Sequence, residues 1–370
     1  MARQKKVKKQ RGFFGKLIRF ILILVLIVVL IGVGYFAYLM IDYSRIADNY
    51  ALTPGGTAAN ADVSTGTRYT IVTQNLGFGA YEQDYTFFMD GGKESWARSK
   101  DAAKNNIKAG CDTANGFNPD FILFQEVDFD STRSYHVDQS KIIEEYFQNY
   151  CFTEAVNFHS SFLMYPIIKP HGIANSEIMT LSRYTITAGV RRSLPISKKL
   201  TKFVDLDRCY SKSRVRVTGG KELVLYNVHL SAYGGSDEIR EGQMKMLFGD
   251  MKDEYDKGNY CVCGGDFNHD FTGTSTQDLN GGESASFGWA QPFPAELLSQ
   301  YAGLTRCTNY TGVLRPTCRN CDVPYEEGNF TIIVDGFLIS NNVSCDSLQN
   351  YYTAFTYSDH CPVVMEFTLN

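Results

Sequence analysis

The chain has 370 residues, of which 44% are hydrophobic and 21% are charged, and this composition excludes an intrinsically disordered protein. Its formal net charge of −4 is unevenly distributed. Residues 1–19 hold eight basic residues and no acidic one, which leaves 28 basic against 40 acidic residues, a net charge of −12, in the remainder. An acidic remainder argues against a domain that binds nucleic acid through its overall charge, because such binding depends on Lys and Arg that neutralise phosphates.

Residues 20–41 follow this basic tail and read FILILVLIVVLIGVGYFAYLMI, with no charged residue. About 20 apolar residues suffice for a helix to cross the hydrocarbon core of a bilayer, so this segment is predicted to be a single transmembrane helix. The basic flank places the tail 1–19 in the cytoplasm and the rest of the chain outside it. A cleaved signal peptide is the alternative, but its apolar region is usually shorter, and no clear cleavage site precedes Asp42.

Residues 42–66 are small and polar, with Pro and Gly, and predict a flexible linker. No second change of composition follows, so residues 67–370 are predicted to form one domain. Within it, apolar runs alternate with two stretches of helical pattern, 95–110 and 236–258, the second capped by Ser236. This alternation predicts an α/β fold whose sheets are covered on both faces.

Six apolar runs of this domain carry, at or near one end, polar residues that are unusual in a core. In chain order these residues are Asn75, Glu126, His229, Asp266 with Asn268, Asp335, and Asp359 with His360. The stretch GGDFN around Asp266 is also typical of a turn, so one such group alone does not indicate a functional site. The repetition of the feature at six strand ends is what indicates a site.

These residue types together point to the hydrolysis of a phosphoester. Carboxylate and amide oxygens are the hard ligands that Mg²⁺ or Mn²⁺ prefers, and histidine moves protons near neutral pH. In such a reaction a metal neutralises the phosphate, a base activates water, and polar donors stabilise the charge of the transition state. The pattern therefore predicts a metal-dependent phosphoesterase with Mg²⁺ or Mn²⁺ as its cofactor.

In six motifs the sequence resembles the endonuclease/exonuclease/phosphatase superfamily, which includes deoxyribonucleases, apurinic endonucleases, neutral sphingomyelinases and inositol-polyphosphate phosphatases. The motifs are TQNLG, FQEV, NVHLSA, GGDFN, VDGFLIS and SDHCPV, and they occur in the family's order across residues 67–370. The resemblance implies a four-layered α/β sandwich, in which two face-packed β-sheets are flanked by helices. Here that sandwich would be preceded by one N-terminal transmembrane helix.

The resemblance also implies which residues bind metal and substrate. Glu126 would be the principal metal ligand, supported by Asn75 and Asp359, and Asn75 would also contact the substrate. Arg183, in a stretch SEIMTLSRY that resembles a family strand, would be a further substrate contact. The chain departs from the apurinic endonucleases at Gly77, where they carry an acidic residue, and this removes one candidate ligand beside Glu126.

The catalytic roles carry over in the same way. Asp266 and Asn268 would orient or activate the attacking water, and Asn268 would also bind phosphate oxygens. His360, paired with Asp335, would act as a base or a phosphate contact. His229 would protonate the leaving group or hold the phosphate. Each of these roles is an expectation that rests on the matching motif.

Several residues have two interpretations. Glu177 is either the carboxylate that orients His229 or an ordinary solvated side chain. The stretch 77–92, GFGAYEQDYTFFMDGG, is either a loop that covers the substrate or a packed surface loop. The remaining histidines, which match no motif and are interpreted as surface or core residues, are His136, His159, His171 and His269.

All ten cysteines follow the predicted membrane segment. Cys307, Cys318 and Cys321 are close in sequence, and CRNC has metal-ligand spacing, but a fourth ligand for zinc is not evident. A local disulfide or free thiols are therefore favoured over a zinc site. Cys261 and Cys263 alternate along a predicted strand and are interpreted as small buried hydrophobic residues.

The leading hypothesis is a membrane-anchored phosphoesterase that acts outside the cytoplasm on a small or lipid-headgroup phosphoester. The stretch that begins NVHLSA is more similar to the sphingomyelinases than to the nucleases. One alternative is an anchored nuclease that cleaves DNA or RNA, for which the basic stretch 191–202 would have to supply a local groove. The other is a non-catalytic binding domain on the same fold, and no protein partner is inferred.

Overall fold

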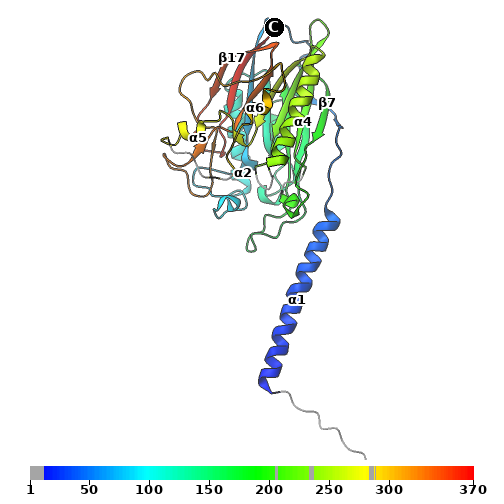
Figure 1. The fold of residues 1–370 in the computed structure, drawn as a ribbon, viewed down its shortest axis with the longest axis vertical. Coiled ribbons are helices and arrows are strands. Elements are labelled where there is room, and N and C mark those ends of the chain that lie inside the picture. Colours follow the sequence, from blue (N-terminus) through cyan, green and yellow to red (C-terminus); the bar gives the residue numbers. More distant parts are fainter. Residues whose placement is uncertain (1–11, 205–206, 233–236, 283–286, 288) are drawn as a thin grey trace, which may run out of the picture. The chain divides into compact units, whose positions relative to one another are not determined.

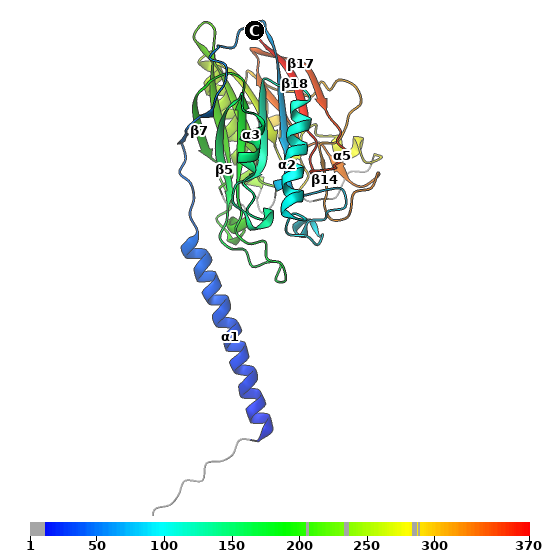
Figure 2. The ribbon, with the colours of Figure 1, turned by 180° about the vertical axis from the view of Figure 1, so that it is seen from behind.

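The computed structural model describes residues 12–204, 207–232, 237–282, 287 and 289–370 and divides into two compact units, Met1–Ser44 and Arg45–Asn370. The first unit contains the helix α1 (Phe13–Asp42), drawn in blue in Figures 1 and 2. Its 30 residues rise about 1.5 Å each. The length of the helix therefore exceeds the thickness of the hydrocarbon core of a bilayer, about 30 Å. By length and composition α1 is a candidate membrane span, and it starts earlier than the predicted segment 20–41.

The second unit is built on two seven-stranded sheets. Sheet A has the order β1 (Tyr50–Leu52), β7 (Ile186–Ser193), β8 (Cys209–Val217), β9 (Lys221–His229), β10 (Tyr260–Asp266), β16 (Asp335–Ser340), β13 (Leu304–Arg306). Sheet B has the order β17 (Val343–Asn350), β18 (Val363–Leu369), β3 (Arg68–Asn75), β4 (Phe121–Asp128), β6 (Asn175–Ser182), β5 (Cys151–His159), β2 (Gly55–Gly56). Two short pairs complete the strands: β11 (His269–Asp270) with β12 (Gln291–Pro292), and β14 (Cys318–Arg319) with β15 (Thr331–Ile332).

The helices of this unit lie on the outer faces of the two sheets, apart from the short α5, which packs against β15. They are α2 (Lys100–Asn115), α3 (Gln139–Tyr146), α4 (Asp237–Asp256), α5 (Ser275–Asp278) and α6 (Ala295–Leu298), with 3₁₀ turns at Gly77–Gly79, Phe88–Asp90, Thr132–Ser134 and Leu200–Val204. Figure 1 shows α4 in front of one sheet, and Figure 2, from behind, shows α2 and α3 in front of the other. Ser236, the predicted cap of the second helical stretch, lies outside the described residues.

Strand β4 shows how the sequence produces these layers. Side chains alternate across a strand, so Phe121 and Leu123 enter the core between the sheets, while Ile122 and Phe124 pack in the cluster beneath α2 and α3. On the other side α4 packs on the outer face of sheet A. The α/β prediction, two face-packed sheets flanked by helices, is confirmed.

The segment 42–66 differs from the predicted flexible linker. Strand β1 pairs with β7 and β2 pairs with β5, so this segment extends both sheets. Further along, Val63 is fully buried and hydrogen-bonds through its backbone to Arg216 and Thr218. Small polar residues can pair in this way because ladder hydrogen bonds use only the backbone. The folded unit therefore begins at Arg45, well before residue 67.

Candidate active site

The predicted strand-end residues gather at one edge of the sandwich, which we call the site edge. Sheet B supplies the carboxyl ends of the parallel strands β3 and β4 and the residues just before β18, and sheet A supplies the carboxyl ends of the parallel strands β9 and β10 and the start of β16. The residues are Asn75, Glu126 and His360 from sheet B, and His229, Asp266 and Asp335 from sheet A. The C-terminus, marked in Figure 1, follows β18 at the opposite edge.

Asp266 lies at the centre of this group. Its Oδ2 accepts a hydrogen bond from Nδ2 of Asn75 at 3.1 Å. The same oxygen lies 3.6 Å from Nε2 of His229 and 3.7 Å from Nε2 of His360. One carboxylate oxygen therefore faces an amide and two imidazoles that come from three different strand ends.

Asn268 supports Asp266 from the turn that follows β10. Its backbone N–H donates to Oδ1 of Asp266 at 2.9 Å, and its side-chain amide donates to the carbonyl of Leu230 at 2.8 Å. Its φ of +50° lies in the left-handed region, which Asn tolerates better than most residues. Burial raises the pKa of Asp266 to about 7; His360 acts in the lowering direction and Asp335 in the raising direction.

His360 and Asp335 form a buried pair across the two sheets. Nδ1 of His360 lies 2.8 Å from Oδ2 of Asp335. Burial by itself disfavours the charged imidazole, but Asp335, Cys318 and Asp266 oppose it, and the pKa of His360 is raised well above its usual value. The pairing orients the ring so that Nε2 faces Asp266 at 3.7 Å.

Glu126 and Asp359 are the carboxylates next to this pair. The Glu126 carboxylate lies 3.3 Å from Nδ2 of Asn75, 3.9 Å from Nε2 of His229 and 3.9 Å from the guanidinium of Arg133. Burial raises the pKa of Asp359 to about 6, and the charge of Glu126 contributes in the same direction, while His360 opposes it. Two acidic groups that repel each other in this way are stabilised by a cation between them.

Two sets of side chains have the chemistry of a divalent-metal site. Glu126 and Asp359 offer carboxylate oxygens, which Mg²⁺ and Mn²⁺ prefer. A second set, Asp266, Asp335 and His360, places its donor atoms within 4.8 Å of one another. In that set Nδ1 of His360 is already engaged by Asp335. We therefore favour the first set, which leaves the His360 pair intact, and the residues present fit a hard divalent cation.

The amide of Asn75 is oriented differently from a metal ligand. Its oxygen accepts a hydrogen bond from the backbone N–H of Gly77 at 2.9 Å, while its nitrogen faces both Glu126 and Asp266. The group between the two carboxylates is thus an N–H donor that bridges them. The structure supports a positioning role for Asn75 more directly than the predicted role as a metal ligand.

His229 is buried and held neutral. Burial lowers its pKa well below the usual value, and the positive charges of Arg208, His360 and Arg133 act in the same direction. Its Nδ1 has no hydrogen-bond partner among the described residues. The contact that Glu177 was predicted to make with this ring is therefore wrong.

Glu177 faces the other side of sheet B. Its neighbours in alternation, Met179 and Leu181, pack in the cluster beneath α2 and α3, whereas His229 projects between the sheets with Leu225. Glu177 is also not a solvated side chain. It is buried against Glu154, and burial together with the charge of that neighbour raises the pKa of Glu177 well above its usual value.

This buried acidic pair predicts a pH-dependent stability. Burial raises the pKa of Glu154 to about 7, and the charge of Glu144 adds to the effect. Between the ordinary pKa of about 4.3 and these raised values, the folded protein binds more protons than the unfolded chain, so the free energy of unfolding falls as pH rises. We expect Glu177→Gln to raise the melting temperature at pH 8 by about 2–4 °C and to leave it unchanged at pH 4.

Thermal unfolding at both pH values measures this effect. Glu145→Gln, an exposed position on α3, is the matched control and should change neither melting temperature. An equal shift for Glu177→Gln at pH 4 and pH 8 would mean that the pair does not hold protons in the folded state.

Arg183 lies outside the site. It follows Ser182, which pairs with Phe121 at the start of β4, whereas Glu126 is near the end of that strand. Five residues at about 3.3 Å each separate these positions by roughly 17 Å along the strand. Arg183 instead binds Tyr150 and Asn118 through its guanidinium. The predicted substrate contact of Arg183 is wrong, because Arg183 stands at the end of the family-like stretch that lies at the opposite edge, where it contributes to packing.

A buried amide bridge beneath the site was not recognised from the sequence as structural. Nε2 of Gln125 donates to Oδ1 of Asn227 at 2.7 Å, which joins sheet B to sheet A. The amide of Asn227 in turn donates to the carbonyls of Phe124 and Met179. In the sequence Gln125 directly precedes Glu126 and Asn227 lies two residues before His229, but only the facing of the two sheets shows that they bind each other.

Arg133 is a second residue that the motifs did not predict. Its guanidinium makes a double hydrogen bond to Asp128, at 3.0 and 2.8 Å, and lies over the ring of Phe78. This holds a buried positive charge next to Glu126. The only sequence signal was its position shortly after the FQEV motif.

The cysteines do not gather as their spacing suggested. Cys318 lies beside His360, Cys321 lies 3.8 Å from a carboxylate oxygen of Asp359, and Cys307 lies beside Cys345 on β17. All ten thiols are free, and among the described residues no cluster of cysteines has the geometry of a zinc site. The free-thiol alternative is the one that this structure contains.

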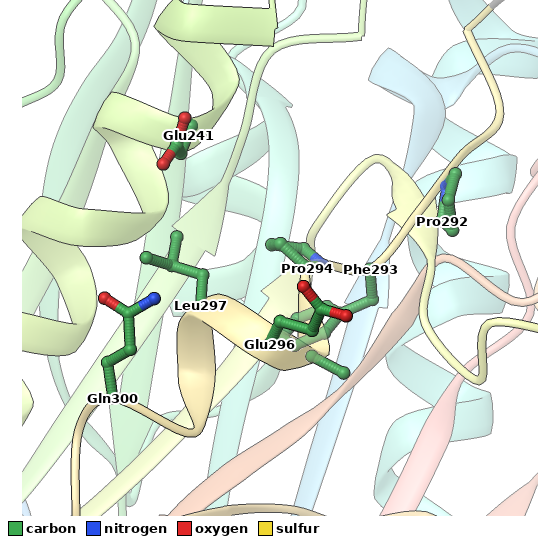
Figure 3. Close-up of a pocket in the computed structure, with 8 residues that line it drawn as sticks. Glu241, Pro292, Phe293, Pro294, Glu296, Leu297 and Gln300 are labelled. Carbon is green, nitrogen blue, oxygen red and sulfur yellow. The ribbon is translucent and has the colours of Figure 1, made fainter.

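The stretch 77–92 and the four histidines outside the motifs remain to be placed in the structure. In the stretch 77–92, Tyr81, Tyr85 and Phe87 are buried in one aromatic cluster, which agrees with the packed-loop interpretation. The four other histidines lie outside the site and have local contacts. His136 is exposed, His159 is half-buried, and His171 and His269 are buried. A pocket of about 460 Å³ between α4 and residues 292–300 is lined by none of the site residues (Figure 3).

Comparison with known proteins identifies a family whose profile matches this chain. The profile of the "Endonuclease/Exonuclease/phosphatase family" matches residues 72–360. No curated protein matches the sequence. The matched range contains every residue of the site edge.

Several solved structures share the fold. The endonuclease/exonuclease/phosphatase from Beutenbergia cavernae is 17% identical, with a TM-score of 0.53 over 82% of this chain and 72% of that chain. The corresponding protein from Bacteroides vulgatus is 14% identical, with a TM-score of 0.52 over 82% of this chain and 100% of that one. D. rerio TDP2, complexed with a single-strand DNA product, is 14% identical, with a TM-score of 0.50 and coverages of 82% and 99%.

Proposed function

Because the chain belongs to the endonuclease/exonuclease/phosphatase family, we propose that it hydrolyses a small or lipid-headgroup phosphoester at the outer side of a membrane in which α1 anchors it. Members of this family are metal-dependent hydrolases of phosphoric ester bonds, so the class of reaction and the need for a divalent metal follow from membership. The observation that carries the proposal is the single carboxylate oxygen of Asp266 that faces Asn75, His229 and His360.

The side chains of the site have complementary tasks in this reaction. Asp266 accepts the proton of the attacking water, and Asn75 and Asn268 hold its carboxylate in place. His360, charged through its pairing with Asp335, stabilises negative charge on the phosphate. His229 is neutral at the same edge and is positioned to bind the phosphate or the leaving group.

Glu126 and Asp359 would hold the divalent metal, for which we propose Mg²⁺, with Mn²⁺ as the alternative. When bound, the metal supplies neutralisation of the phosphate charge and polarises its ester. Glu126 is held toward this position by Asn75 and by the positive charge of Arg133.

The substrate class is argued from charge. The chain after residue 19 has a net charge of −12, which disfavours a long polyanion. In the basic stretch 191–202, Arg191 is buried and bound to the carbonyls of Val156 and Asp207, and Arg192 is paired with Asp48 and Asp250. These two arginines are therefore engaged within the fold instead of lining a groove for nucleic acid.

The second candidate is a nuclease, and one fold neighbour was solved in complex with a single-strand DNA product. The exposed Lys198 and Lys199 in the same stretch are the observation in its favour. Release of phosphate or headgroup from a panel of phospholipid vesicles, nucleotides and DNA, with Mg²⁺ and with excess chelator, separates the two. Efficient cleavage of DNA that falls steeply between about 50 and 200 mM salt would replace our proposal with the nuclease.

Removal of one ligand should change the dependence on metal. We expect Glu126→Gln to raise the Mg²⁺ concentration that gives half-maximal activity by about 10–100-fold, because it removes a carboxylate ligand and keeps the size of the side chain. A metal titration of the hydrolysis rate measures the change, with Glu145→Gln as the control. If the wild-type rate is undiminished by excess chelator, the proposed metal chemistry is wrong.

A further inference from the structure

The loop between β5 and β6 exposes an apolar tip. Tyr165 is 67% exposed, Ile167 is 83% exposed and Ile168 is 100% exposed. Large aliphatic side chains on a soluble surface usually contact at least part of their own fold, so a fully exposed Ile next to another exposed Ile requires an explanation. We define Tyr165, Ile167 and Ile168 as the apolar tip.

The tip is held outward by an ordered base. Leu163 and Gly172 exchange two backbone hydrogen bonds at 3.0 and 3.1 Å, which close the loop. The hydroxyl of Ser95 donates to the carbonyl of Lys169 at 2.7 Å, and the indole of Trp96 donates to the carbonyl of Pro170 at 2.6 Å. The loop is thus attached to the unit at its base, and the apolar side chains project beyond this attachment.

The apolar tip belongs to the site edge. β6 runs antiparallel to β4, so Ser176 pairs with Asp128, two residues after Glu126, and the loop directly precedes β6. In Figures 1 and 2 a green loop lies at the end opposite to the labelled C-terminus, while the green turn between β8 and β9 lies at the same end as the C-terminus.

The start of the second unit is attached at the same edge. The backbone N–H of Ile46 donates to Asp207 at 3.0 Å, and the guanidinium of Arg45 donates to the carbonyl of Leu194 at 2.9 Å. Asp207 lies just before β8, which begins beside the end of β9 that carries His229. Because α1 ends at Asp42, the chain from there to Arg45 can span at most roughly 11 Å.

The site edge also exposes positive residues on another segment. The segment between β7 and β8 exposes Lys198, Lys199 and Leu200, of which Leu200 is 64% exposed. Basic side chains next to exposed aliphatic ones are typical of surfaces that lie in the headgroup region of a bilayer.

We propose that the apolar tip inserts into the surface of the bilayer that α1 crosses, so that the site edge faces lipid and takes its phosphoester from the membrane. This deepens the proposed function and rests on it for the identity of the substrate. We argue for a lipid bilayer as the partner of the apolar tip from the position of α1 in the sequence. This helix is long enough to cross a membrane and ends at Asp42, only three residues before Arg45, which is bound at the site edge.

Insertion can be measured without activity. The full chain carrying Ile168→Cys is labelled with an environment-sensitive fluorophore and reconstituted in vesicles of phosphatidylcholine and phosphatidylglycerol, with or without spin-labelled lipid. We expect blue-shifted emission that spin-labelled lipid quenches several-fold. Thr218→Cys, in the turn between β8 and β9 at the opposite edge, is the control and should stay in water.

Nine of the native thiols are buried, and the unsubstituted chain measures any background labelling. Emission from position 168 that remains that of water in vesicles overturns the proposal. Emission that shifts equally in detergent and rises with protein concentration also overturns it, in favour of contact between copies of this chain.

The consequence for activity is tested separately. Ile167→Ser with Ile168→Ser is expected to lower hydrolysis of a phosphoester embedded in the vesicles at least tenfold and to leave hydrolysis of a soluble phosphoester unchanged. Equal rates on the embedded substrate would overturn the role of the tip in substrate capture. If neither substrate is hydrolysed by the wild-type chain, the proposed function fails while the fluorescence result still decides insertion.

Discussion

Replacement of Asp266 by Asn is expected to lower kcat by about 10³-fold, within the range for loss of a general base. Asn has the same size and can still accept the N–H of Asn268, so the turn after β10 should persist. What is lost is the charged oxygen that faces Asn75, His229 and His360. Steady-state kinetics at saturating Mg²⁺ measures the change, and thermal unfolding reports whether the fold is kept.

Asp253→Asn is the matched control, because Asp253 is an exposed carboxylate on the outer helix α4. It should change neither kcat nor the melting temperature. If Asp266→Asn keeps kcat within a few-fold of the wild type while its fold is intact, Asp266 does not accept the proton of water in this reaction.

Replacement of Gly265 by Ala is expected to destabilise the protein by about 3 kcal/mol or more. Gly265 has a φ of +147°, and a Cβ placed there would lie 2.0 Å from the carbonyl oxygen of Val228 on the neighbouring strand. That oxygen belongs to the sheet ladder and cannot move without disturbing β9 next to His229. We therefore expect a large fall in melting temperature and loss of activity in whatever protein still folds.

Gly219→Ala separates the two causes of this effect. Gly219 also has a positive φ, +102°, but a Cβ there would meet nothing within 4 Å. Ala at this position should cost only about 1–2 kcal/mol of backbone strain. If the two variants lose equal stability in denaturant unfolding, the contact with Val228 is not what requires glycine.

The sequence indicated which residues lie together because they stand at strand ends, and their roles stay predictions. Asp266, Asp335 and His360 each follow or precede an apolar run, and strands that pair in a sheet bring their ends to the same edge without further information. The expectations for Glu177 and Arg183 failed because each depends on the face of the strand, or the end of the strand, at which the side chain lies. Glu177 is one residue out of phase with the inner face of β6, and Arg183 is at the far end of the same strand.

Residues 50–63 could not be predicted for a different reason. Most of their side chains are small and they carry no periodic pattern, so composition indicates a linker. Their place in the fold depends on backbone hydrogen bonds to the outer strands β7 and β5, for which almost any sequence is suitable. The metal site could be predicted in kind, but the orientation of the Asn75 amide depends on the N–H of Gly77.

The amide bridge between Gln125 and Asn227 makes the reacting groups depend on how the two sheets are aligned. Asn75 and Asp266, and likewise His360 and Asp335, are partners from opposite sheets, so none of these contacts exists within one sheet alone. A small slide of one sheet over the other would separate the partners while leaving each ladder of strands complete. On heating, we therefore expect the hydrolysis rate to be lost at temperatures where circular dichroism still reports native strands. The rate would then report how well the two sheets are aligned.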